Sequence, residues 1–170
     1  DLNGEKLTEL PLSFNVIKGS FACNFNYLNT LKGSPNTVEG DFFCNNNNLT
    51  TLEHSPQIVT GMYVCSFNKL KSLKGCPTFI NGDFICDKTS IKSFDGAPQY
   101  IKYDFSCSGN NIRTLNNCPK YGRTVNLNNN PIHQIFKLFI KQHKGIMGFI
   151  VSEMSLEKER ELIEYFNELD

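Results

Sequence analysis

Apolar and polar positions recur along this chain with a period of 21 residues, which predicts a stack of equivalent coils. Cysteine and proline keep this spacing in two separate columns, at Cys23, Cys44, Cys65, Cys86 and Cys107 and at Pro35, Pro56, Pro77, Pro98 and Pro119. An aromatic residue stands two positions before each cysteine, at Phe21, Phe42, Tyr63, Phe84 and Phe105. Side chains two apart on a strand point to the same face. We therefore predict one short parallel strand per coil, with the aromatic residue and the cysteine in the core.

Polar and aliphatic columns continue the same phase after each cysteine. Asparagine follows three residues later at Asn26, Asn47, Asn68 and Asn110, whereas Thr89 takes this place in the fourth coil. Leucine, isoleucine or phenylalanine follows at Leu28, Leu49, Leu70, Ile91 and Ile112 and again at Leu31, Leu52, Leu73, Phe94 and Leu115. A buried turn leaves backbone N–H and C=O groups that an amide side chain can satisfy. The asparagine column is thus predicted to be structural, and the coil with Thr89 the locally weakest.

The repeat extends over most of the chain. A degenerate sixth coil covers residues 125–135, with Leu127 in the cysteine place and Asn130 in the asparagine place, and Leu7 and Leu10 are remnants of an earlier coil. The crossover of each coil is too short and too rich in Gly, Pro, Asn and Ser for a full helix. We expect tight turns or brief 3₁₀ segments there, with the right-handed connection usual for parallel strands. The predicted solenoid spans residues 1–135.

The residues of one coil carry a resemblance to a known family. Phe21-x-Cys23-x-x-Asn26-x-Leu28-x-x-Leu31 is similar to the leucine-rich-repeat signature, in its short 21-residue form. The unit Gly82-Asp83-Phe84-x-Cys86 resembles repeat proteins from tailed phages. One departure is that Val38, Val59, Ile80 and Ile101 precede the aromatic residue by four positions instead of three.

This resemblance implies an α/β repeat fold: a right-handed parallel β-solenoid with a turn-rich convex side and a concave face that binds partners. The phage likeness further implies action in a host cytoplasm, by inhibiting or redirecting a host protein. Residues 136–170 are expected to form a helical C-terminal cap. Pro131 suits the first turn of a helix, and Ser155 suits the N-cap of a last helix with Leu162, Ile163, Phe166 and Leu169 on one face. An independent binding helix is the alternative for this segment.

Composition and charge narrow the function classes. Seventeen basic and seventeen acidic residues cancel, so the whole molecule has no strong field toward nucleic acid or an anionic membrane. No apolar run approaches the roughly 18 residues of a membrane span. Five cysteines in phase are predicted to be apolar fillers whose unpaired thiols suit a reducing, cytoplasmic compartment, without disulfides or zinc. We expect no cofactor.

Catalytic chemistry has little support in the residues. His54 falls in a turn and His133 and His143 fall in the cap, and no Ser/His/Asp or Cys/His set shares a predicted neighbourhood. Met62 interrupts the acidic column of Asp41, Asp83 and Asp104, which argues against calcium along it. The chain is therefore predicted not to be an enzyme.

The outward side of the predicted strands is the candidate site. An apolar patch with an acidic border is expected there, formed by Phe25, Phe43, Met62, Val64, Phe67 and Ile85 with Asp41, Asp83, Asp87 and Asp104 at its edges. Exposed apolar patches of this kind are typical of protein-binding sites. The alternatives are cover by the cap helices, or a virion or assembly component that packs against copies of itself.

A basic flank is expected in the turns after the strands, from Lys69, Lys71, Lys74, Lys88, Lys92 and Arg113. Charge on turns is usually only solvated, so nucleic acid is the less favoured partner. We expect a monomer or weak self-association.

Overall fold

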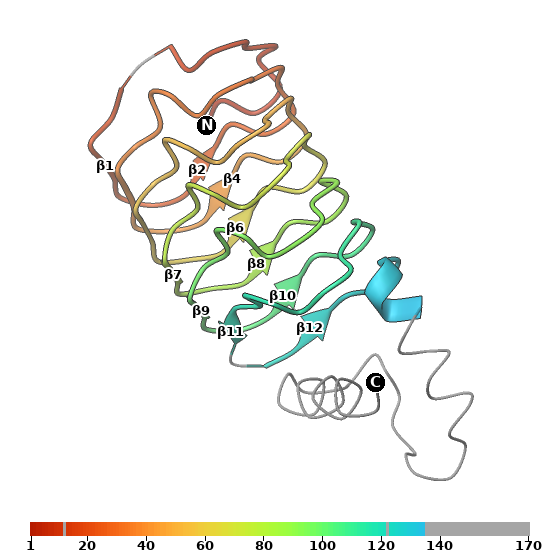
Figure 1. Ribbon diagram of the computed structural model, residues 1–170. Coiled ribbons are helices and arrows are strands. Elements are labelled where there is room, and N and C mark those ends of the chain that lie inside the picture. The colour runs from red at the N-terminus through yellow and green to blue at the C-terminus, as the bar shows by residue number, and fades with distance from the viewer. Residues whose placement is uncertain (12, 122, 135–170) are drawn as a thin grey trace, which may run out of the picture.

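The chain winds into a parallel β-solenoid in which each coil carries two short strands (Figure 1). The computed structural model describes residues 1–134, apart from residues 12 and 122. Sheet A contains β1 (Val16–Ile17), β3 (Thr37–Val38), β5 (Ile58–Val59), β7 (Phe79–Ile80), β9 (Tyr100–Ile101) and β11 (Lys120–Tyr121). Sheet B contains β2 (Phe21–Ala22), β4 (Phe42–Phe43), β6 (Tyr63–Val64), β8 (Phe84–Ile85), β10 (Phe105–Ser106) and β12 (Val125–Asn126).

Every coil is stacked in register on the next. Phe21 pairs with Phe42 and Phe42 with Tyr63, so the 21-residue sequence period is also the structural period. The final step is one residue shorter, because Phe105 pairs with Val125. The predicted parallel strands are confirmed, including the one in the degenerate sixth coil.

The core of sheet B is built as the period-two pattern predicts. The cysteine column is fully buried, and neighbouring aromatic rings from Phe21 to Phe105 lie with centroids 5.1–5.9 Å apart. All seven cysteines belong to the described part of the chain, and none forms a disulfide. Parallel strands hold the column side chains pointing the same way, which is the wrong geometry for bridging them.

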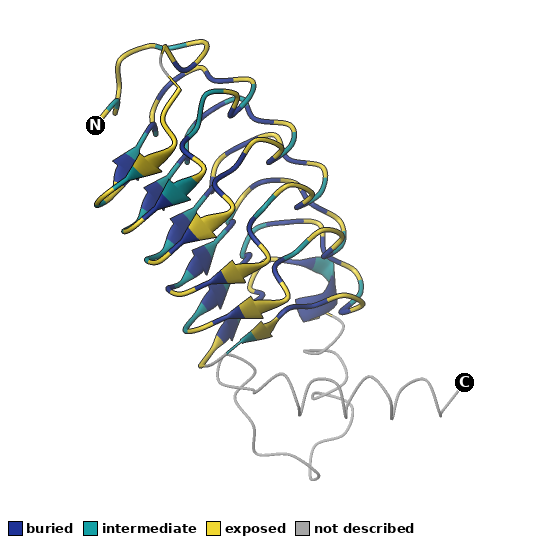
Figure 2. Ribbon diagram, turned by 90° about the vertical axis from the view of Figure 1, so that its left-hand side faces the viewer, coloured by how far each residue is buried: buried dark blue, intermediate teal, exposed yellow. Residues whose placement is uncertain are grey.

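Sheet A was not predicted, because the crossover was expected to contain only turns or 3₁₀ segments. Val38, Val59, Ile80 and Ile101 are buried, while the residue before each of them points outward. Two extended residues suffice for this alternation, and coils in register then pair them in parallel. Figure 2 shows the resulting change from an exposed to a buried residue along β5, β7 and β9. The four-residue step before the aromatic residue thus marks a corner between two sheets.

The asparagine column forms the predicted ladder. The amide nitrogen of Asn68 donates to the carbonyl oxygens of Cys44 (3.0 Å) and Cys65 (2.9 Å), and its oxygen accepts the N–H of Leu49 (3.0 Å). Asn47 repeats the arrangement one coil earlier. Each asparagine therefore satisfies backbone groups of its own coil and of the preceding one, which ties neighbouring coils together.

Thr89 replaces this arrangement with a smaller one. Its hydroxyl lies 3.1 Å from the Cys86 carbonyl oxygen and 2.9 Å from the side-chain oxygen of Asn110. That Asn110 oxygen also accepts the N–H of Thr89 itself. Without an amide, Thr89 supplies no second donor for the carbonyl oxygen of Cys65 in the coil before it.

The two ends of the described solenoid differ from its middle. Leu10 is buried and Leu2 and Leu7 pack against the core, so the N-terminal remnant covers part of the first coil. Residues 131–134 are helical, as Pro131 at a first turn predicts. The remainder of the predicted cap, residues 136–170, lies outside the described residues.

Candidate functional site

The predicted apolar patch lies on the outer face of sheet B. Phe43, Val64 and Ile85 occupy neighbouring strands in register and are all half-buried, as is Met62 at the entry of β6. Their side chains point away from the core, because the alternate residues Phe42, Tyr63 and Phe84 fill it. The structure thus places Phe43, Val64 and Ile85 in a continuous row, with Met62 two residues before Val64 beside it.

Phe25 and Phe67 belong to a turn that follows the strand, not to the strand itself. Both have a left-handed backbone, with φ of 54° and 55°. The same place in other coils holds Asn46, Lys88, Gly109 and Asn129, all with positive φ, so the left-handed turn is a feature of the repeat. Asparagine and glycine are the residue types that suit it. Both phenylalanines are exposed, by 58% and 49%. A bulky aromatic side chain is thus kept in an unfavourable backbone conformation without being buried in the fold.

The acidic border has a structural role that the residue pattern did not predict. A carboxylate oxygen of Asp41 accepts the N–H of Met62 (2.8 Å), and Asp83 accepts that of Asp104 (3.0 Å). Asp87 accepts the Ser106 hydroxyl (2.7 Å) and the N–H of Ser108 (2.8 Å). These carboxylates therefore link consecutive coils at the edges of sheet B. The 21-residue spacing of Asp83 and Asp104 was the sequence signal for this link, because residues one period apart lie in adjacent coils.

A second apolar surface, on sheet A, was missed. We call Ile58, Phe79 and Tyr100 the apolar stripe, since they stand side by side on β5, β7 and β9 with exposed fractions of 54%, 62% and 41%. Thr37 and Lys120 hold the equivalent places on β3 and β11. The sequence did contain a signal for this surface, because two apolar residues stand side by side in each of these coils. Only the second of the two is buried, so the first must point outward.

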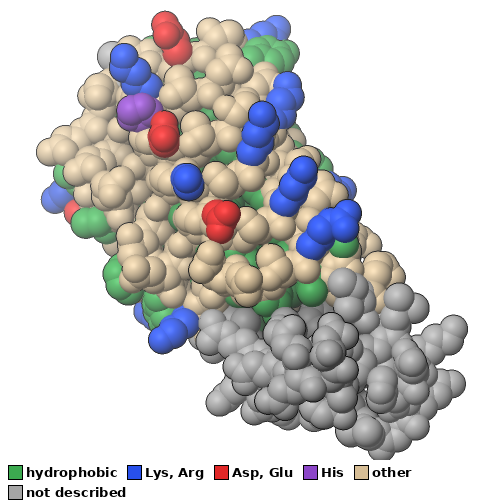
Figure 3. All heavy atoms as spheres, viewed as in Figure 1, with side chains coloured by type: hydrophobic (Ala, Val, Ile, Leu, Met, Phe, Trp, Pro, Cys, Tyr) green, Lys and Arg blue, Asp and Glu red, His purple; other side chains and the backbone are tan. Residues whose placement is uncertain are grey.

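The predicted basic flank is present along the turns of the middle coils. We call Lys69, Lys71, Lys88, Lys92 and Arg113 the basic ridge; all five are exposed. Figure 3 shows Lys and Arg side chains following one another along the right-hand edge of the molecule. Lys74, also in the predicted flank, stands in another column, in line with Glu53 and Asp95.

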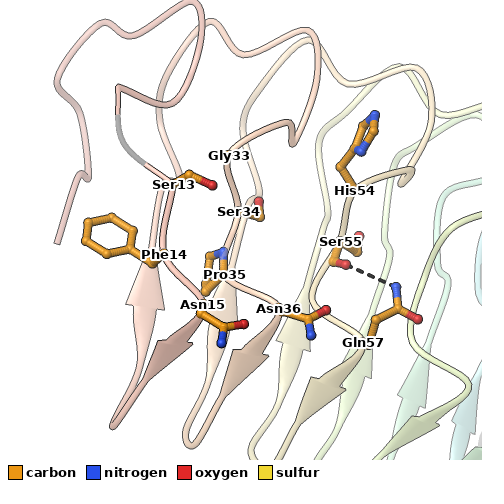
Figure 4. A pocket seen from close by; sticks show the side chains of 10 residues that line it. All are labelled: Ser13, Phe14, Asn15, Gly33, Ser34, Pro35, Asn36, His54, Ser55 and Gln57. Carbon is orange, nitrogen blue, oxygen red and sulfur yellow. Dashed lines mark hydrogen bonds between the residues drawn. The ribbon is translucent and has the colours of Figure 1, made fainter.

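A polar groove surrounds His54 on the turn side of the second coil (Figure 4). His54 has a φ of 68° at a place where Gly33 and Gly75 have φ of 96° and 93°. The neighbouring Ser55 hydroxyl faces the core, where it donates to the Leu52 carbonyl oxygen and lies 2.7 Å from the Tyr63 hydroxyl. No carboxylate is among the ten residues that line the groove. The groove therefore offers no acid to orient the histidine and no accessible nucleophile at Ser55.

The buried thiols are poor nucleophiles. Burial raises the pKa of the Cys23 thiol to about 12, and that of Cys44, Cys65 and Cys86 well above its ordinary value. Cys76 is more accessible, yet burial also raises the pKa of its thiol to about 12. Because the thiolate is the reactive form, these cysteines are protonated and inert near neutral pH.

The described part of the chain contains no metal-ligand cluster and no membrane-spanning helix. No group of three or more His, Cys, Asp or Glu side chains in this part of the chain is arranged to hold a metal ion. None of its helices has the length and apolar character needed to cross a membrane. Comparisons with protein-family models, with curated proteins and with solved structures gave no match.

Proposed function

We propose that this protein is a non-enzymatic binding module of the leucine-rich-repeat type, and that the outer face of sheet B and the turn after it contact another protein. The observation that carries the proposal is the exposure of Phe25 and Phe67 on left-handed backbone. A left-handed conformation is unfavourable for most L-residues, by roughly 1–2 kcal/mol. Strained, exposed residues are concentrated at binding sites. Aromatic side chains are also enriched at the centres of protein interfaces.

Phe43, Met62, Val64 and Ile85 extend the same surface across sheet B, bordered by Asp41, Asp83, Asp87 and Asp104. The patch combines an apolar centre with a charged margin, the usual anatomy of an interface. The likeness of the repeat unit to tailed-phage proteins favours a host protein in the cytoplasm as partner, which binding would inhibit or redirect.

The test separates binding from folding through two substitutions that the repeat itself suggests. In the variant Phe25→Asn/Phe67→Asn both aromatic rings are removed, while asparagine suits the left-handed backbone, as it does at Asn46 and Asn129. We expect its unfolding free energy to be equal to or above that of the unchanged protein. Proteins captured from a host lysate by the unchanged chain should be lost.

The matched control is Phe79→Thr, which removes an equally exposed ring from sheet A and installs the residue type that Thr37 has on β3. Its capture should be unchanged. If the asparagine variant captures the same proteins at the same level, the two phenylalanines are not binding residues and the proposal fails.

A second candidate function, self-assembly as a structural component, is favoured by the apolar stripe. Ile58, Phe79 and Tyr100 present an exposed row on adjacent strands that a second copy could cover. Light scattering after size exclusion at micromolar concentration should then give a mass above the monomer, and Phe79→Thr should reduce it. A monomeric mass for the unchanged chain would exclude this function at that concentration.

A further inference from the structure

The basic ridge lies next to the proposed binding surface. The Lys88 ammonium nitrogen is 5.0 Å from the centroid of the Phe67 ring, so the ridge contacts an aromatic residue of that surface. Lys69 and Lys71 follow Phe67 within the same turn. A partner seated on Phe67 would therefore also meet these cations.

The ridge is uncompensated within the described part of the chain. Lys71, Lys92 and Arg113 stand in one column on three successive coils, and no described acidic side chain forms an ion pair with any ridge residue. Neighbouring coils are about 4.8 Å apart, well inside the roughly 8–10 Å over which salt screens charges. The three cations repel one another, and an acidic partner would relieve that repulsion.

The size of the ridge favours an acidic protein segment over nucleic acid. Three successive coils span only about 10 Å, while nucleic-acid binding gains from neutralising many phosphates along a strand. The chain has a sequence pI near 7.0, whereas nucleic-acid-binding domains commonly exceed about 9. A short segment that also places an apolar side chain against Phe67 suits the arrangement better.

The coil spacing also indicates the conformation of that segment. Acidic side chains at i and i+4 on a helix are about 5–6 Å apart, close to the roughly 4.8 Å between coils. Same-face side chains on a strand are nearly 7 Å apart and would fall out of step with the column. We propose that the partner presents an acidic helix, which lies along Lys71, Lys92 and Arg113 and contacts Phe67 with an apolar side chain. This inference rests on the proposed function.

The probe for the experiment is a synthetic helical peptide with glutamate at every i, i+4 position of one face and leucines beside it. Its binding to the full chain is followed by fluorescence anisotropy at 50 and 300 mM salt. We expect binding that weakens at the higher salt, and at least a tenfold loss of affinity in Lys71→Glu/Lys92→Glu/Arg113→Glu. The matched control Lys18→Glu/Lys32→Glu/Lys102→Glu changes net charge equally at exposed positions and should keep the affinity.

Three outcomes would overturn the inference: no peptide binding, equal binding by the ridge variant and the unchanged chain, or tenfold tighter binding of a single-stranded DNA of equal charge. Circular dichroism on both charge variants establishes that they are folded. The lysate experiment separates the two proposals. If the asparagine variant loses the captured protein and the ridge variant keeps it, the acidic-helix inference fails while the proposed function stands.

Discussion

Replacing Asn68 by alanine should destabilise the protein more than the same change at Asn47, although both side chains are buried and make equivalent hydrogen bonds. The difference lies in which backbone groups keep a partner. Without Asn47, the carbonyl oxygens of Cys23 and Cys44 still accept from Asn26 and Asn68, and only the N–H of Leu28 loses its acceptor.

Without Asn68, two groups are left without their partner. The N–H of Leu49 loses its acceptor, and the Cys65 carbonyl oxygen loses the one side-chain donor that the described structure gives it. The next coil does not compensate, since Thr89 has no amide. A buried unsatisfied backbone group costs about 1–3 kcal/mol. The packing lost with the amide is the same at both positions, so Asn68→Ala should cost about 1–3 kcal/mol more than Asn47→Ala.

The variant Thr89→Asn tests the reasoning directly. An asparagine there should donate to Cys65 as Asn110 donates to Cys86 (2.9 Å), leaving Asn68→Ala with only one unsatisfied group. In this background the two alanine substitutions should cost the same. Urea unfolding followed by far-ultraviolet circular dichroism gives all the free energies. Equal costs in the natural background, or a difference that persists with Thr89→Asn, would refute the ladder argument.

Two other predictions concern buried polar groups. Ser34→Ala should raise the unfolding free energy by about 1 kcal/mol, because the buried Ser34 hydroxyl has no hydrogen-bond partner in the described structure. Ser55→Ala should lower the unfolding free energy by about 1–3 kcal/mol, because the buried hydrogen bond between the Ser55 and Tyr63 hydroxyls is lost. Thermal melts in which both variants shift in the same direction would contradict this. Stability should also fall in alkali, because burial raises the pKa of the Cys44, Cys65 and Cys86 thiols in the folded protein. The same thiols ionise near their ordinary pKa of 9.0 in the unfolded chain, so raising the pH above 9.0 favours unfolding. The unfolding free energy is then expected to fall by about 1.4 kcal/mol per pH unit for each thiol. Urea midpoints measured at pH 8 and pH 10 check this, and equal midpoints would contradict it.

The core was predictable from the sequence because its residues obey a strict period. Aromatic residues and cysteines that are two apart and recur every 21 residues predict stacked parallel strands with both residues in the core. The asparagine column predicts side chains that satisfy backbone groups in the turns. Sheet A was not predicted, because each of its strands has only two residues and lies within a stretch rich in glycine and proline. Extended structure that short is created by pairing between coils, which local propensity does not reveal.

The candidate surface was predicted less well. Phe43, Val64 and Ile85 follow from strand alternation, but Phe25 and Phe67 were placed on the strand although it ends before them. Their left-handed backbone could not be predicted from the residue type, because phenylalanine does not favour positive φ. Asn46 and Gly109 in the same column carried the signal, because these residue types favour positive φ. Tyr100 and Phe79 were overlooked because exposed aromatic residues resemble core residues in a sequence.

The asparagine ladder has a consequence for how such a chain can change its length. Each rung joins backbone groups of adjacent coils, so removal of one complete 21-residue unit brings together two ends that fit as the old ones did. Loss of a single residue within a strand or an asparagine turn would instead misalign the rung at that junction. The last coil is one residue shorter because the loss falls between Pro119 and Lys120, away from the rung, and Asn130 still donates to the Cys107 carbonyl oxygen (2.9 Å). Viable length variants of this protein should therefore be shorter or longer by whole units, with the surface they offer to partners growing or shrinking by one row at a time.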